Sequence, residues 1–114
     1  MMLRPFLTSL ILILLLVACA EPQISEIKLT LQEMGFSQNE IEVSANQPVT
    51  LHLNNKDGYA HAFDLDEFDI HIQLAAEETA EITFTPSHSG TFTFYCGSPG
   101  HQAAGMEGSL VVMP

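Results

Sequence analysis

Three side chains with soft donor atoms lie on one short segment near the end of this 114-residue chain. Cys96, His101 and Met106 follow the spacing Cys-x4-His-x4-Met and offer a thiolate, an imidazole and a thioether. A type 1 copper site takes two His and one Cys in a nearly trigonal plane, with a weak and long axial Met. The segment therefore supplies three of the four ligands that such a site uses.

The fourth ligand must come from elsewhere in the chain, and the alternation of side chains along strands favours His61. Successive residues of a strand face opposite sides of its sheet. Cys96 shares a side with Phe92 and Phe94, and these two Phe residues mark the interior. His61 shares a side with Phe63 in the same way. We therefore expect both donors to point inward, and to meet if their strands are neighbours.

The remaining three His residues do not fit this site. His52 and His71 alternate with apolar neighbours, so we expect both on exposed faces of strands. His88 lies in a Pro- and Gly-bounded turn at 86–90. None of the three is predicted to bind the metal.

The segments that position these residues have the pattern of short β-strands. Apolar and polar residues alternate with a period of two, and no segment has a convincing helical period. Loops rich in Asn, Asp and Gly separate them, as at 54–58. Seven to eight closely spaced strands predict an all-β sandwich or barrel. The expected strands are 27–31, 41–43, 49–53, 60–65, 70–74, 80–85, 91–96 and 109–112.

The start of the chain has the features of an export signal, which we expect to span residues 1–18. Arg4 precedes an almost wholly apolar run at 6–17. About a dozen apolar residues suit a signal peptide, whereas a membrane-spanning helix needs roughly 20. An uncleaved short transmembrane anchor is the alternative. A single folded domain is then expected at 24–114, with one modest core.

The residues after this run resemble the lipobox of bacterial lipoproteins. Leu16-Val17-Ala18-Cys19 stands directly after the apolar segment. The resemblance implies cleavage before Cys19 and a lipid on its sulfur, so that 19–23 would tether the domain to the extracytoplasmic side of a membrane, periplasmic or outer. The alternative is ordinary cleavage that leaves a free thiol. Cys96 is then the one Cys of the domain, so no intramolecular disulfide is expected.

The expected mature chain is strongly acidic. It holds two Lys against 14 Asp and Glu, a net charge of −12. This balance argues against nucleic acid as a partner, because phosphates attract basic groups. It fits either simple solubility or docking on a basic face of a redox partner.

The Cys96–Met106 loop, with its Cys-x-x-Pro-Gly-His core, resembles the copper loop of the cupredoxins, especially the azurin, auracyanin and rusticyanin group. Residues 55–63 resemble the segment that carries the first His, and 81–86 together with 90–92 resemble the pair of strands that lead to the Cys. The resemblance implies a cupredoxin-like Greek-key β-sandwich with one type 1 copper at one end. It implies His61, Cys96 and His101 as strong ligands and Met106 as the axial ligand.

The same resemblance gives the loop around His101 a function. It implies that His101 is the port for electrons and that a small apolar patch beside it, formed by Pro99, Ala103 and Ala104, contacts partners. The alternative is that these residues only serve tight packing of the loop. One departure concerns Ala62, because many cupredoxins have Asn or Ser there, whose side chain ties the two ligand segments together.

We therefore predict a monomeric, membrane-tethered blue copper protein that shuttles single electrons between redox proteins such as an oxidase, a reductase or a cytochrome. It is not predicted to be an enzyme, since the paired His-x-His motifs and several domains of multicopper oxidases are missing. The alternative function is a copper carrier or chaperone that delivers copper to a membrane oxidase. Its donor atoms would be the same.

Overall fold

The computed structural model of the protein describes residues 13–18, 21 and 23–114. The predicted lipidation site, Cys19, and most of the predicted signal peptide lie outside the described residues. Within the described ranges, no helix has both the length and the apolar character that crossing a membrane requires. Everything that positions the candidate site lies downstream of residue 24.

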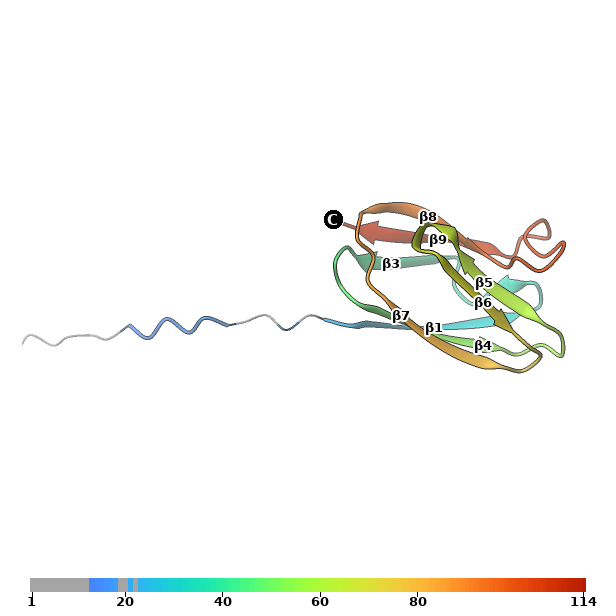
Figure 1. Ribbon diagram of the computed structural model, residues 1–114, viewed down its shortest axis with the longest axis horizontal. Helices are drawn as coiled ribbons and strands as arrows, with labels where there is room; N and C mark the ends of the chain where they lie inside the picture. Colours follow the sequence, from blue (N-terminus) through green and yellow to red (C-terminus); the bar gives the residue numbers. More distant parts are fainter. Residues whose placement is uncertain (1–12, 19–20, 22) are drawn as a thin grey trace, which may run out of the picture.

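Two β-sheets pack face to face (Figure 1). One sheet has the strand order β2-β1-β4-β7, and the other has the order β3-β9-β8-β5-β6. A single 3-10 turn, η1 (Asp66–Phe68), is the only helical element in the part of the chain that the structure describes. The strands are β1 (Ser25–Gln32), β2 (Gly35–Phe36), β3 (Glu40–Ser44), β4 (Val49–Asn55), β5 (His61–Leu65), β6 (Ile70–Leu74), β7 (Thr79–Phe84), β8 (Gly90–Tyr95) and β9 (Glu107–Met113).

The predicted all-β sandwich is confirmed, with β2 as the strand that the sequence did not indicate. This strand has two residues, too few for an alternating pattern to appear. Two strand pairs, β1 with β4 and β3 with β9, run parallel, whereas the other pairs run antiparallel. Parallel partners need long connections, so distant parts of the chain must come together before the sandwich is complete.

Alternating apolar residues on the inner faces of both sheets form one core. In β1 the buried residues are Leu29 and Leu31, with polar residues between and beside them. An aromatic group joins the sheets: Phe63 and Phe94 stack at 5.5 Å between ring centroids, and Phe36 meets Phe94 edge-on at 5.1 Å. Such contacts add to the apolar burial that stabilises the domain.

Strand β5 is buried along its whole length. The alternation of side chains correctly places His61, Phe63 and Leu65 in the interior, where each is at most 1% exposed. Ala62 and Asp64, which alternation assigns to the outer face, are also buried. The reason is that β5 lies between β6 and β8, and groups from both sides cover its outer face.

The two ends of the sandwich are distinct. The chain enters at the start of β1, and the loops around His61 and Cys96 lie at the other end, on the right of Figure 1. Ser25, at the start of β1, pairs with Val49, whereas Leu31 near its end pairs with Asn55, at the start of the His61 loop. Eight residues of extended strand span roughly 26 Å, which separates the site from the N-terminal segment.

Candidate metal centre

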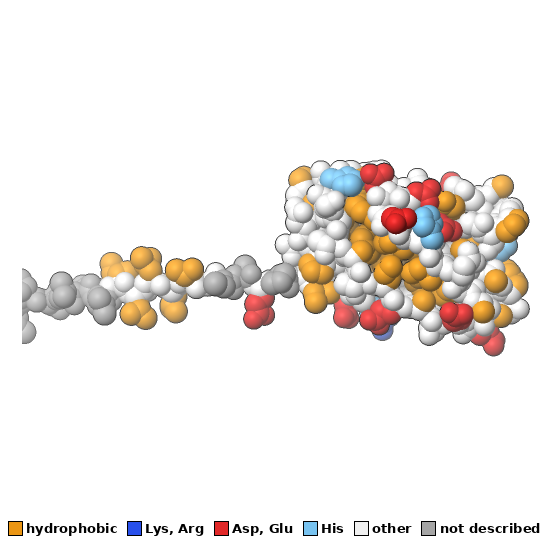
Figure 2. Space-filling model, viewed as in Figure 1, with side chains coloured by type: hydrophobic (Ala, Val, Ile, Leu, Met, Phe, Trp, Pro, Cys, Tyr) orange, Lys and Arg blue, Asp and Glu red, His pale blue; other side chains and the backbone are white. Residues whose placement is uncertain are grey.

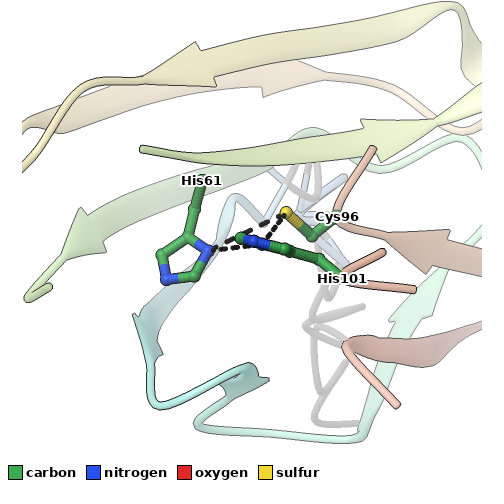
Figure 3. A group of neighbouring side chains, drawn as sticks. All are labelled: His61, Cys96 and His101. Carbon is green, nitrogen blue, oxygen red and sulfur yellow. Dashed lines mark hydrogen bonds between the residues drawn. The ribbon is translucent and has the colours of Figure 1, made fainter. Parts of the chain in front are cut away.

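His61, Cys96 and His101 come together at one end of the sandwich (Figure 3). The two His residues present their Nδ1 atoms to each other at 3.2 Å. The Cys96 Sγ atom lies 3.4 Å from Nδ1 of His101 and 3.9 Å from Nδ1 of His61. Among the described residues this is the one group of His, Cys and acidic side chains whose donor atoms cluster closely enough for a metal.

The spacing of these atoms suits one metal ion between them. An ion with bonds of about 2.0 Å to nitrogen and 2.3 Å to sulfur, at trigonal angles, holds its donors about 3.5–3.7 Å apart. The three observed separations, from 3.2 to 3.9 Å, bracket this range. Two imidazoles and one thiolate near a Met are the donor set of a type 1 copper site, so the residues present fit one such ion.

Backbone hydrogen bonds hold the loop that carries Cys96, His101 and Met106. The Cys96 N–H donates to the Met106 carbonyl at 3.0 Å, and the Met106 N–H donates to the His101 carbonyl at 3.1 Å. Met106 is fully buried, as is Cys96, while His101 is partly exposed. The loop closes at Gly105, whose φ of 99° is a conformation that side chains disfavour. The loop is therefore tied at each predicted ligand.

A second set of hydrogen bonds shapes the loop before His61. Asn55 is fully buried, and its Nδ2 donates to the carbonyls of Tyr59 at 2.8 Å and Ala75 at 3.0 Å. Its Oδ1 accepts the N–H of Asp57 at 3.0 Å. The Tyr59 ring packs against His61, with 4.9 Å between ring centroids. Asn55 thus fixes the turn that brings Asp57 and Tyr59 against the His61 ring.

Asp57 accepts a hydrogen bond from the far side of the His61 ring. His61 Nε2 lies 2.7 Å from Asp57 Oδ2, which also accepts the Glu33 N–H at 2.9 Å. The hydrogen bond with His61 holds the pKa of the Asp57 carboxyl below its ordinary value, against an opposing effect of desolvation. An ionised Asp57 favours the tautomer with the proton on Nε2, so Nδ1 keeps its lone pair for a metal.

The two ligand segments are tied together although Ala62 lacks a polar side chain. The Ala62 N–H donates to Cys96 Sγ at 3.2 Å. Asp64, two residues on, accepts the Gly97 N–H through Oδ2 at 2.9 Å, and its Oδ1 pairs with His71 Nδ1 at 2.8 Å. The two ligand segments are therefore connected without Asn or Ser at position 62. Asp64, two residues further along β5, makes the connection through its hydrogen bond with Gly97.

Gly97 is required by this contact. A Cβ atom at position 97 would collide with the Asp64 carboxylate. The hydrogen bond therefore depends on a residue without a side chain directly after Cys96. Only glycine allows β5 and the Cys96 loop to approach each other this closely.

Sequence reasoning missed Asn55, Asp57 and Asp64. One signal was available for Asp64, because a carboxylate between Phe63 and Leu65 in an apolar run is unusual unless it has partners. Asn55 and Asp57 lie in a segment whose composition indicates only a loop. Their roles depend on which carbonyls and ring atoms the fold brings near them.

The other His residues lie on the surface, as predicted. His52 pairs with Glu81 at 3.1 Å, and His88 pairs with Glu67 at 2.9 Å. His71 is 51% exposed. Around His101 the three residues predicted to contact partners, Pro99, Ala103 and Ala104, are all exposed. Their role in docking stays a prediction.

Comparisons with known proteins agree with this site. The chain matches the model of the cupredoxin-like domain over residues 6–112. Auracyanin-A of Chloroflexus aurantiacus is 30% identical to it over 112 aligned residues, covering 71% of this chain and 68% of that protein. The nitrous-oxide reductase of Ralstonia nicotianae is 33% identical over 73 residues, covering 61% of this chain and only 11% of the reductase.

A solved structure gives the same result for the fold. The structure of auracyanin A, described as a blue copper protein from a green thermophilic photosynthetic bacterium, superposes with a TM-score of 0.68 at 25% identity. The match covers 79% of this chain and 99% of that chain. Fold, donor cluster and family match together show that the chain belongs to the cupredoxin-like domain family, with a site for one type 1 copper.

Proposed function

We propose that the protein is an electron carrier that works outside the cytoplasm, tethered to a membrane by a lipid on Cys19. The observation that carries this proposal is the convergence of His61, Cys96 and His101 at one end of the sandwich. His61 and Cys96 are fully buried, and His101 alone is partly exposed. Such a site is closed to bulk solvent but keeps one edge for contact.

On this proposal His61, Cys96 and His101 would hold the copper as strong ligands, and the Met106 thioether would be the weak fourth ligand. Copper in such a site supplies reversible one-electron chemistry. The residues around it contribute rigidity: Asp57 and Asn55 hold the His61 side, whereas Asp64 and the Cys96–Met106 backbone bond hold the other. Little rearrangement is then needed when the oxidation state changes, which suits electron transfer.

Docking is assigned to the surface around His101. Pro99, Ala103 and Ala104 are exposed beside it and form a small apolar contact area. The rest of the domain is acidic, and Figure 2 shows acidic side chains spread over one face with basic groups almost absent. Opposite charge steers association, so the expected partner is a redox protein with a basic face around its own port.

The tether is proposed from the sequence, and the position of the N-terminus in the fold is compatible with it. The N-terminal segment joins the domain at the end opposite His101, so a lipid on Cys19 would leave the copper end directed away from the membrane. We expect Cys19→Ser to release the protein into the soluble fraction without changing its visible spectrum. A variant that stays in the membrane fraction would contradict the lipid anchor.

The test of the copper site is a visible absorption spectrum of the protein with Cu(II), recorded beside Cys96→Ser. We expect an intense thiolate-to-copper band in the wild type, reversible bleaching by a mild reductant, and no band in the variant. On this proposal the protein is not an enzyme and needs no substrate. A wild type that holds copper without this band, or binds Cu(I) alone, would favour the alternative of copper delivery.

A further inference from the structure

We propose that Asp57 is a positioning residue for His61 and that its negative charge makes the site favour Cu(II) over Cu(I). The inference rests on the proposed function, because it takes His61 as a copper ligand. It goes further by naming the group that sets the balance between the two oxidation states.

The geometry carries the positioning part. The Asp57 carboxylate and the His61 ring are in direct contact at 2.7 Å, and their side chains are 11% and 0% exposed. The Glu33 N–H holds the same carboxylate oxygen at 2.9 Å, which limits its movement. With Nε2 as donor, the His61 Nδ1 faces Cys96 and His101 as an unprotonated nitrogen. A carboxylate in this position both orients a ligand imidazole and raises its basicity.

The charge balance carries the second part. A carboxylate that is mostly shielded from water is stabilised by a positive charge nearby. Among the residues that the structure describes, His61 is the only basic side chain that pairs with Asp57, and neither Lys28 nor Lys56 does. A metal cation bound at the Nδ1 side of His61 would place a positive charge across the ring from the Asp57 carboxylate. Because Cu(II) carries one more positive charge than Cu(I), a fixed negative charge across the ring stabilises Cu(II) more.

The other buried acid beside the site is arranged differently. Asp64 binds the Gly97 N–H and pairs with His71, a side chain that reaches the surface. A protonated His71 can balance Asp64 without any metal. Within the described part of the chain, Asp57 pairs with no basic side chain at the surface, and the Tyr59 hydroxyl that it contacts is neutral, so its charge acts mainly through the His61 ring. This difference singles out Asp57 as the residue that favours Cu(II). A site whose task is to carry Cu(I) would gain nothing from such a charge.

The test compares Asp57→Asn with Glu33→Gln in the full chain, solubilised in detergent. Asn keeps the size and acceptor of Asp but removes its charge, while Glu33→Gln removes a charge nearby and keeps the backbone N–H that binds Asp57. We expect Asp57→Asn to lower Cu(II) affinity about 10–100-fold, with a much smaller change in Cu(I) affinity. The reduction potential should rise about 59 mV for each tenfold change in their ratio.

The matched control shows whether the reduction potential depends on the Asp57–His61 contact or on any negative charge near the site. Glu33→Gln should change the affinity ratio by less than about threefold, because an exposed charge is screened by solvent and salt. An equal shift in both variants would overturn the role assigned to the Asp57–His61 contact. An unchanged or lower potential in Asp57→Asn would overturn it as well.

A measurement on the wild type keeps the inference testable even if Asp57→Asn fails to fold. Nitrogen NMR of the metal-free protein should show His61 protonated at Nε2, with a slowly exchanging proton. Protonation at Nδ1 instead would overturn the positioning role. If the wild type lacks the thiolate–copper band, the proposed function itself fails. If the band is present and the potential does not respond to Asp57, only this inference fails.

Discussion

Two His–Asp pairs lie close to the Cys96 loop, and in each a carboxylate oxygen contacts one ring nitrogen, Nε2 in His61 and Nδ1 in His71. His61 and Asp57 meet at 2.7 Å, whereas His71 and Asp64 meet at 2.8 Å, and each carboxylate is about one-tenth exposed. The His rings differ, since that of His61 is fully buried and that of His71 is 51% exposed. Burial of the imidazole therefore distinguishes the predicted metal ligand from a His–Asp pair at the surface.

The surroundings of the two rings explain what each pair can do. The second nitrogen of His61 faces Cys96 and His101. The second nitrogen of His71 lies 3.7 Å from Asp69, at the surface. The hydrogen bond to Asp64 raises the pKa of His71, helped by the charges of Asp64, Asp66 and Asp69 and opposed by desolvation. The His71 pair is thus a structural ion pair, and the His61 pair is part of the metal centre.

The largest effect on stability is expected from Asp64→Ala, which removes the acceptor shared by Gly97 and His71. A part-buried N–H and a charged partner then lose their hydrogen bonds, so the free energy of unfolding should fall by about 2–3 kcal/mol. Urea unfolding of the metal-free protein measures this change. The control is Asp69→Asn, which removes a fully exposed acid, keeps a residue type that tolerates the left-handed backbone there, and should stay within about 0.5 kcal/mol. Equal effects of the two substitutions would contradict a structural role for the His71 pair.

A somewhat smaller loss is expected from Gly97→Ala. The new methyl group collides with Asp64, and overpacking of this kind costs about 1–3 kcal/mol. In an Asp64→Ala background the same substitution should cost much less, because the colliding carboxylate is gone. A double-mutant cycle by urea unfolding measures this coupling. Additive effects would show that Gly97 and Asp64 are not in the close contact described.

The pH dependence of stability should come partly from His71. Because its pKa is raised in the folded protein, the pair stabilises the fold fully below the ordinary value of 6.5, and this contribution is lost as the pH rises through the folded pKa. The free energy of unfolding of the metal-free protein should therefore decrease on going upward from pH 6.5. His71→Gln should flatten this slope. An unchanged slope in the variant would assign the dependence to another group.

The two pairs should also differ in their influence on copper. His71→Gln should change the ratio of Cu(II) to Cu(I) affinity by less than about threefold, because its exposed charge is screened by solvent. Asp57→Asn should change that ratio far more, because the Asp57 carboxylate contacts the His61 ring directly. Redox titration of the two variants side by side measures both. A larger shift for His71→Gln would break the distinction between the pairs.

The smallest effect is expected for a third pair on the surface of the other sheet. His52 and Glu81 lie 3.1 Å apart with side chains 36% and 63% exposed. Exposed pairs of this kind contribute little, so His52→Gln should change the free energy of unfolding by no more than about 0.5 kcal/mol. A loss above 1 kcal/mol would show that burial does not determine how much each pair contributes to the free energy of unfolding. Urea unfolding again provides the measurement.

Much of the site could be predicted because it depends on short-range patterns. The alternation of Phe92, Phe94 and Cys96 is a property of one strand, and the spacing of Cys96, His101 and Met106 is a property of one loop. The inward direction of His61 follows from the same rule applied to β5. Asp64 illustrates where the rule ends, since alternation assigns it to an exposed face and the structure buries it.

By itself the sequence determined the class of fold, the donor types and the inward direction of His61 and Cys96, because periodicity and spacing are local. Only the tertiary structure decided which groups support the donors. Asp57 reaches His61 through a loop that Asn55 closes, and Asp64 reaches Gly97 because β5 lies beside the strand that ends at Cys96. Asp64 and Gly97 are far apart in the chain, and Asp57 meets the nearby His61 only in a turn that Asn55 holds through tertiary contacts. A sequence pattern therefore does not show which partners compensate these carboxylates for the loss of water.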